Sequence, residues 1–236
     1  MSTFLAFLNF SYKNYMRQHR YLRDIIAVVV FSIFFGGFLT NPVRDDTIWL
    51  VFCVFALLLN LLTAPAVFFM DDSATLYFLI GKPGGRRRIF LAKVALIILI
   101  DLMWVSCFAV LYGLRFGEIA FFLGMPVRLM LLGMILTLST LWISLAYTYR
   151  PQLTWLIFLV LIFGNIVAKQ KMLDFDSPLS AIKGLSLLLP PFLELDFLAV
   201  EPVWNGWTAL FAGITLLQSG ILMWVSLRQM QRRDIY

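Results

Sequence analysis

Long apolar runs, separated by short charged or proline-containing stretches, fill most of this chain. Several of the runs approach the ~20 residues that a helix needs to cross a bilayer. The apolar positions are continuous and do not alternate, which predicts helices and not the strands of a barrel. We therefore expect an all-α integral membrane protein with six transmembrane helices in a single domain, 1–236. The predicted spans are residues 21–40, 47–70, 89–112, 126–149, 152–168 and 207–227.

Two further segments are apolar without being good spans. Residues 3–20 carry apolar side chains at helical spacing and basic ones on another face, which predicts an N-terminal interfacial helix. The alternative is an extended start of the first span. Residues 185–200 are mostly apolar but are interrupted by Pro190-Pro191. We expect an outer re-entrant segment here, built of two short extracytoplasmic helices, with a seventh span as the alternative.

Composition and charge support the membrane class. The chain is 61% hydrophobic and 14% charged, whereas a soluble domain is nearer half apolar and a quarter charged. The net charge of +6 comes from basic residues at the ends of segments, so we expect contact with membrane lipid and no nucleic acid. Of the 19 Lys and Arg residues, 13 fall on the side that holds the N-terminus. This asymmetry places both termini in the cytoplasm.

Reactive side chains are sparse. The chain has two cysteines and one histidine, and none of them forms a metal-binding or catalytic motif with neighbours. Gly81-Lys82 lacks the spacing of a phosphate-binding loop. We expect no catalytic residue, metal or cofactor in this chain, and a membrane-embedded enzyme is disfavoured. If ATP drives the protein, another chain must bind it.

Asp101 is the polar residue that needs explanation, because it lies near the middle of the third predicted span. A central acid costs about 2.5–3.5 kcal/mol on insertion scales, so it should face protein or water. One reading makes Asp101, Asn60 and Asn165 a candidate translocation path. The other makes Asp101 structural, either protonated or hydrogen-bonded to Asn60, Asn165 or a serine on a neighbouring helix.

The most strongly charged interruption lies between the second and third spans. Asp72 or Ser73 can cap a short helix over residues 72–80, and Gly81 with Pro83 ends it. Three arginines then precede the third span. A short cytoplasmic helix with an apolar face suits a groove on a soluble partner, although it could also rest on lipid headgroups. Its apolar face is formed by Leu76, Tyr77 or Phe78, Leu79 and Ile80.

The order of acid, serine, leucines, proline and arginine in this segment resembles the corresponding loop of ABC-2-type ABC transporter permeases. The interfacial helix, six spans and outer helices are similar to that family over the whole chain. The chain departs from it at Tyr77, where the family often has Glu, and at Ala74, where the family often has Gly.

The resemblance implies a permease subunit of an export-type transporter for a hydrophobic or amphipathic solute, in the bacterial cytoplasmic (inner) membrane. It also implies two copies of an ABC ATP-binding subunit, which hold ATP and Mg, and a second permease subunit in a homo- or heterodimer. The alternative is a non-transporting membrane anchor or regulatory subunit of a larger complex. The residues that would couple to the ATPase are Asp72, Ser73, Leu76, Tyr77, Leu79 and Ile80.

Overall fold

The computed structural model describes residues 3–69, 84–117, 119–167 and 188–232, and the regular structure in these ranges is helical. The predicted coupling helix 72–80 lies outside the described residues. The helices are α1 (Thr3–Arg17), α2 (Tyr21–Phe35), α3 (Gly37–Thr40), α4 (Asp45–Phe68), α6 (Gly85–Phe116), α7 (Ile119–Thr148), the 3-10 turn η1 (Pro151–Leu153), α8 (Thr154–Ile166), α10 (Phe192–Val200) and α11 (Gly206–Arg232).

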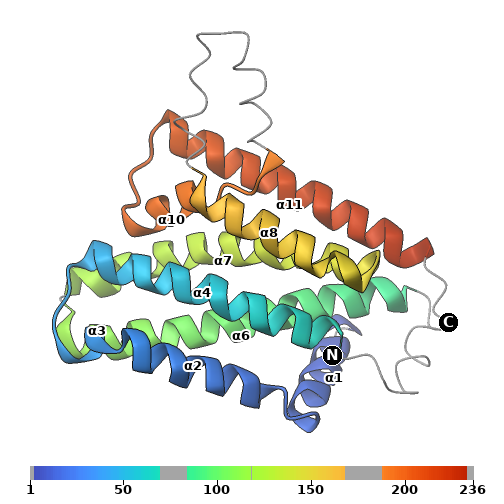
Figure 1. The fold of residues 1–236 in the computed structure, drawn as a ribbon, viewed down its shortest axis with the longest axis horizontal. Helices are drawn as coiled ribbons and strands as arrows, with labels where there is room; N and C mark the ends of the chain where they lie inside the picture. The colour runs from blue at the N-terminus through green and yellow to red at the C-terminus, as the bar shows by residue number, and fades with distance from the viewer. Residues whose placement is uncertain (1–2, 70–83, 118, 168–187, 233–236) are drawn as a thin grey trace.

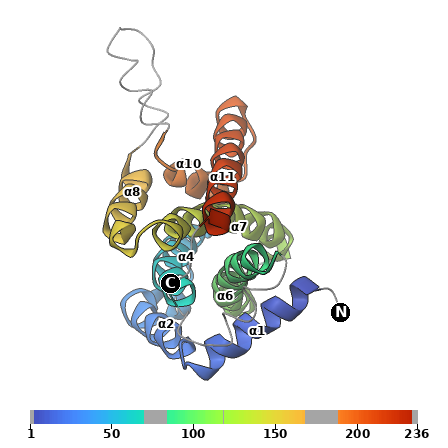
Figure 2. The ribbon, with the colours of Figure 1, turned by 90° about the vertical axis from the view of Figure 1, so that its right-hand side faces the viewer.

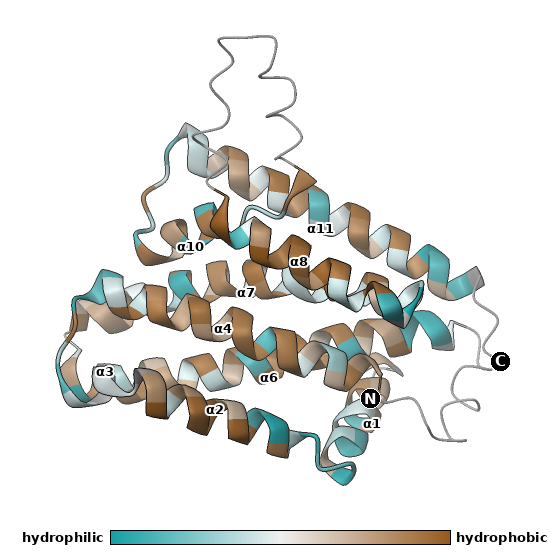
Figure 3. Cartoon of the chain, viewed as in Figure 1, coloured by the Kyte–Doolittle hydropathy of each residue, from teal (hydrophilic) through white to brown (hydrophobic). Residues whose placement is uncertain are grey.

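Six helices run along the long axis, and each runs opposite to the one before it in the chain: α2, α4, α6, α7, α8 and α11 (Figure 1). Four of them, α4, α6, α7 and α11, are long and apolar enough to cross a membrane. Their middles are hydrophobic and their ends are more polar (Figure 3). Long apolar helices with polar ends are typical of a multi-pass membrane protein. Helices α2 and α8, with 15 and 13 residues, fall short of the ~20 residues of a full span.

The first predicted span, 21–40, is broken in the structure. Helix α2 ends at Phe35, and the short α3 follows after Gly36. A Cβ atom at Gly36 would overlap the carbonyl oxygen of Ser32, so a residue with a side chain would not fit here without a shift of the backbone. The Ser32 hydroxyl also donates to the carbonyl of Val28, a contact that bends helices.

The fourth helix begins earlier than the predicted residue 126. Helix α7 starts at Ile119, and Pro126 lies inside it. The added turns carry Phe121, which is buried and stacks on Trp49 with 5.5 Å between ring centroids. Phe121 also contacts Tyr112 at 5.6 Å. This packing offsets the hydrogen bond that Pro126 cannot donate.

Helix α4 occupies the centre of the bundle and packs against α2, α6, α7 and α10. Large aromatic side chains are buried along its length, among them Trp49, Phe52, Phe55 and Phe68. Helix α10 is a helix within the predicted outer segment 185–200, and it lies on α4 and α7. Apart from Asp196, its buried residues are apolar, which explains why a nine-residue helix is held in place.

Helix α1 crosses one end of the bundle, beside α2 and α6 (Figure 2). It confirms that most of segment 3–20 is helical, with its end at Arg17. The chain then reverses through His19, whose φ of 53° lies in the left-handed region. Phe7 packs against Ile89 and Ala92 of α6, so this helix is fixed to the bundle by side chains.

A buried lysine joins three helices at the same end. Lys93 of α6 is 1% exposed, and its Nζ donates to the carbonyl oxygen of Phe68 at 2.9 Å. Phe68 is the last residue of α4, where the helix dipole favours a cation. The same ammonium group lies 4.7 Å from the centre of the Tyr147 ring of α7. Lys93 therefore caps α4 and ties it to α6 and α7.

Candidate functional site

A set of buried polar side chains connects α4, α6 and α7 in the middle of the bundle. Asn60 of α4 donates from Nδ2 to Asp101 Oδ2 of α6 at 2.7 Å and to Thr140 Oγ1 of α7 at 2.9 Å. Both amide hydrogens of Asn60 are thereby used. All three side chains are fully buried. Asp101 thus faces protein, as expected from the free-energy cost of placing an acid in lipid. Asn60 is one of the hydrogen-bond partners that we predicted for it from the sequence.

A second buried pair extends the polar set towards α1. Asp24 of α2 accepts a hydrogen bond from the hydroxyl of Tyr15, and both side chains are buried. Thr63 of α4 lies between the two carboxyl groups. Its hydroxyl is 3.5 Å from Asp24 Oδ1 but 2.9 Å from the carbonyl oxygen of Leu59, which is the better-placed acceptor. We call these six residues the polar relay: Tyr15, Asp24, Thr63, Asn60, Asp101 and Thr140.

Tyr15 is held as a hydrogen-bond donor. Burial raises the pKa of its phenol well above the usual range, and the bond to Asp24 raises it further. Because the neutral phenol keeps its proton, Tyr15 can anchor α1 to α2 at any ordinary pH. Sequence reasoning missed Tyr15 and Asp24, since Asp24 follows Arg23 at the start of a span and reads as an interfacial charge.

The polar relay retains buried acceptors that have no hydrogen-bond partner among the described residues. They are Asp101 Oδ1 and Asn60 Oδ1. An acceptor left in this way inside an apolar bundle carries a desolvation cost. The polar relay is therefore only partly satisfied by the residues that the structure describes.

Asn165 lies elsewhere, on α8, and lines a cavity of about 320 Å³ between α4, α8 and α10. We call this space the α8 cavity. Asn60 and Asp101 are not among its lining residues, so the structure brings together two of the three predicted path residues and separates the third. The apolar lining residues are Leu50, Val54, Leu57, Leu58, Leu61, Leu161, Ile162, Ile166, Phe192 and Leu193.

Two polar side chains join Asn165 in the α8 cavity. Ser139 of α7 and Asp196 of α10 are both buried, and neither Ser139 Oγ nor Asp196 Oδ1 has a hydrogen-bond partner among the described residues. The cavity is therefore apolar with a few convergent polar groups, the usual character of a small-molecule site. Its volume lies at the lower end of the ~300–1,000 Å³ found for such sites.

Asp196 is not among the site residues predicted from the sequence. Burial against α4 raises the pKa of the Asp196 carboxyl to about 7. A hydrogen bond from Cys53 lowers this pKa, and the charge of Glu194 raises it. A signal for this burial exists in the sequence. Asp196 shares a helical face with Phe192 and Ala199, and both are buried.

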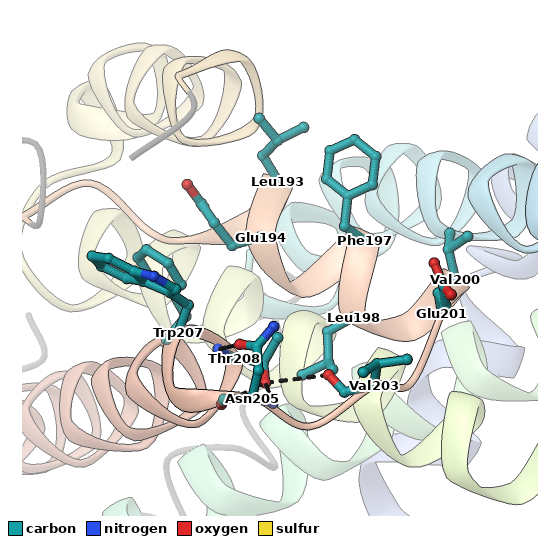
Figure 4. Close-up of a pocket in the computed structure, with 11 residues that line it drawn as sticks. Leu193, Glu194, Phe197, Leu198, Val200, Glu201, Val203, Asn205, Trp207 and Thr208 are labelled. Atoms are coloured by element: carbon teal, nitrogen blue, oxygen red, sulfur yellow. Dashed lines mark hydrogen bonds between the residues drawn. The ribbon is translucent and has the colours of Figure 1, made fainter. Parts of the chain in front are cut away.

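A second pocket, of about 360 Å³, lies between α10 and the start of α11 (Figure 4). Asn205 and Thr208 cap α11 reciprocally. The Thr208 backbone N–H donates to Asn205 Oδ1 at 2.9 Å, and the Asn205 backbone N–H donates to Thr208 Oγ1 at 2.7 Å. Because these polar groups are already engaged in the cap, this pocket is less suited than the α8 cavity to orient a ligand.

Within the described ranges, no group of three or more His, Cys, Asp or Glu side chains could hold a metal ion. The predicted coupling residues Asp72, Ser73, Leu76, Tyr77, Leu79 and Ile80 lie outside those ranges. No known protein-family model and no curated protein sequence matches this chain.

Proposed function

We propose that this chain is the membrane-spanning permease subunit of an ATP-driven, export-type ABC transporter that moves a hydrophobic or amphipathic solute. ATP is hydrolysed by a separate ABC ATP-binding subunit, present in two copies, and a second permease subunit completes the membrane part. The proposal includes six crossings of the bacterial cytoplasmic membrane. The alternating direction of the six lengthwise helices supports it, with α2 and α8 as the two short crossings (Figure 1).

The distribution of basic residues supports the orientation. Arginines lie in the turn between α1 and α2, in the first turn of α6 and near the end of α11, and these places share one end of the bundle (Figure 3). Lys and Arg gather on the cytoplasmic side of membrane proteins. This end is therefore the one that faces the ATP-binding subunits in the proposal.

The observation that carries the proposal is the link from α1 to the middle of the bundle through the polar relay. Helix α1 lies across the basic end, where a soluble partner would press on it (Figure 2). Its Tyr15 is bonded to Asp24, and Thr63 stands between Asp24 and the Asn60–Asp101 pair. In this proposal, a displacement of α1 reaches α2 through the Tyr15–Asp24 hydrogen bond, and α2 packs on α4, which the Asn60–Asp101 hydrogen bond joins to α6.

The α8 cavity supports the class of solute. Its walls are almost entirely aliphatic, and Ser139 and Asp196 offer a small number of polar contacts at one place. Such a space favours a molecule with an apolar body and one hydrogen-bonding group. The coupling role of residues 72–80 is part of the proposal through the family resemblance.

One observation favours the alternative of a non-transporting anchor or regulatory subunit. Asn60 spends both amide hydrogens on Asp101 and Thr140, and all three side chains are fully buried, which fits a purely structural role for Asp101. The alternative predicts no ATP-dependent solute movement by the wild type, so Asp101→Asn has no effect on transport.

The test begins with extraction of the chain from its native membrane in mild detergent. We expect a soluble ATP-binding protein to co-purify, in equal amount if the second permease subunit is a copy of this chain and in twofold amount if it is a different chain. We also expect ATP-dependent solute movement after reconstitution into vesicles. Leu76→Asp and Leu79→Asp should abolish both. The control, Val203→Asp, changes an exposed residue at the opposite end of the bundle and should abolish neither. Absence of any nucleotide-binding partner, with the chain intact and folded, refutes the proposal.

A further inference from the structure

An arginine-lined pocket of about 530 Å³ lies at the basic end of the bundle, between the start of α6 and the end of α11. Its lining residues are Arg87, Trp224, Leu227, Arg228 and Gln231. Arg86 donates to the carbonyl oxygen of Gln231 at 3.2 Å, which holds the two helix ends together. The pocket is therefore made by two helices far apart in the sequence but fixed side by side.

Arg87 and Arg228 bring two positive charges into this pocket. No carboxylate of the described residues forms an ion pair with Arg87 or Arg228. Arg228 lies over the ring of Trp224 at 5.1 Å, which orients its guanidinium group. The guanidinium groups of Arg87 and Arg228 match the oxygens of a phosphate, which arginine binds in a bidentate manner.

An apolar stripe leads away from the pocket along α11. Leu217, Ile221 and Trp224 follow one another at helical spacing and are 62%, 53% and 59% exposed. A small soluble anion would make no contact with this apolar stripe, whereas the acyl chains of a phospholipid would pack along it. Basic pockets between membrane helices on the cytoplasmic side are known to hold anionic headgroups.

We propose that Arg87 and Arg228 bind the headgroup phosphate of an anionic phospholipid whose acyl chains follow Leu217, Ile221 and Trp224. This site is independent of ATP-driven transport, because it depends only on the membrane location of the chain. A bound lipid would also join α6 to α11 at the basic end.

The test uses the full chain in detergent and native mass spectrometry. Dioleoylphosphatidylglycerol and dioleoylphosphatidylcholine are titrated separately, and the wild type should bind the anionic lipid more tightly. Since one arginine near the surface contributes roughly fivefold in affinity, Arg87→Gln or Arg228→Gln should lower it about fivefold and the double variant about thirtyfold. Arg88→Gln is the matched control, since Arg88 is equally exposed and adjacent but does not line the pocket.

Three results overturn the proposal. The first is equal binding of the two lipids by the wild type, and the second is a loss with Arg88→Gln as large as that with Arg87→Gln, which would indicate general charge attraction. The third is displacement of the lipid by glycerol 1-phosphate at a similar concentration, which would show that the headgroup alone is recognised and that the apolar stripe has no part. All variants should retain the thermal unfolding midpoint of the wild type, because the substituted side chains are exposed.

Discussion

The contact between Asn60 and Asp101 allows a sharp test of how the centre of the bundle is held. Asn60→Leu keeps the approximate volume of the side chain but removes both of its hydrogen bonds. Asp101 Oδ2 and Thr140 Oγ1 then lose their donor inside an apolar environment. An unpaired buried polar group costs about 1–3 kcal/mol, while interhelical hydrogen bonds in membrane proteins average about 0.6 kcal/mol. Between these limits, we expect Asn60→Leu to lower the free energy of unfolding by about 2 kcal/mol.

The double variant Asn60→Leu/Asp101→Leu gives the decisive comparison. It removes both partners, so neither an amide nor a carboxyl group is left unpaired between them. Replacing a buried polar pair by apolar residues of similar size is often close to neutral. We therefore expect the double variant to be no less stable than Asn60→Leu alone, with a coupling energy of about 1–2 kcal/mol between the two sites.

The assay is reversible unfolding by sodium dodecyl sulfate in mixed micelles, followed by circular dichroism. Asn165→Leu is the control, because this asparagine is half-buried on α8 and belongs to the α8 cavity and not to the polar relay. It should change the unfolding free energy by less than about 0.5 kcal/mol. If the effects of Asn60→Leu and Asp101→Leu simply add, within about 0.5 kcal/mol, the two side chains do not support each other and the polar relay is wrong.

Three more predictions concern other parts of the bundle. Tyr15→Phe should destabilise the protein by about 2 kcal/mol in the same unfolding assay, because it removes the hydrogen bond to Asp24, whereas Tyr12→Phe on the exposed face of α1 should change it by less than about 0.5 kcal/mol. Gly164→Val should lower the free energy of unfolding by about 1–3 kcal/mol and loosen the chain before α10, because the new Cβ would lie 2.7 Å from Pro190 Cγ. Equal protease sensitivity of the variant and the wild type in this part of the chain would contradict the close approach. The pKa of Asp196 is about 7 in the fold and 3.8 in the unfolded chain, so the stability of the wild type should fall as the pH rises between these values, by up to about 1.4 kcal/mol per pH unit. Asp196→Asn should remove this part of the pH dependence in chemical unfolding measured from pH 4 to pH 7.

Most of the helical plan could be read from the sequence because long apolar runs are strong signals. The helix α4 begins and ends within two residues of the predicted span 47–70, and α11 contains all of 207–227. The errors occur where tertiary contacts override local rules. Pro126 is a good first residue for a helix, but Phe121 packs against two aromatic residues and extends α7 before it.

The candidate site was only partly visible in the sequence. Asp101 was found because an acid in the middle of an apolar run is expensive, and Asn60 was named as a partner for it. Asp24 and Asp196 were overlooked because each lies near the end of an apolar segment, where an acid usually faces water. Their burial depends on α1 and α10 folding back onto the bundle, and a one-dimensional pattern does not record that return.

The position of Lys93 has a mechanical consequence for the chain between α4 and α6. Its ammonium group fastens the last carbonyl of α4 to the first turns of α6, so both ends of the intervening segment leave from one rigid support. In the proposed transporter, a partner that pushes on this junction would therefore move the end of α4 and the start of α6 together. Bending α4 away from α6 would first break the hydrogen bond between Lys93 and the carbonyl of Phe68 in a buried environment, so this junction resists bending.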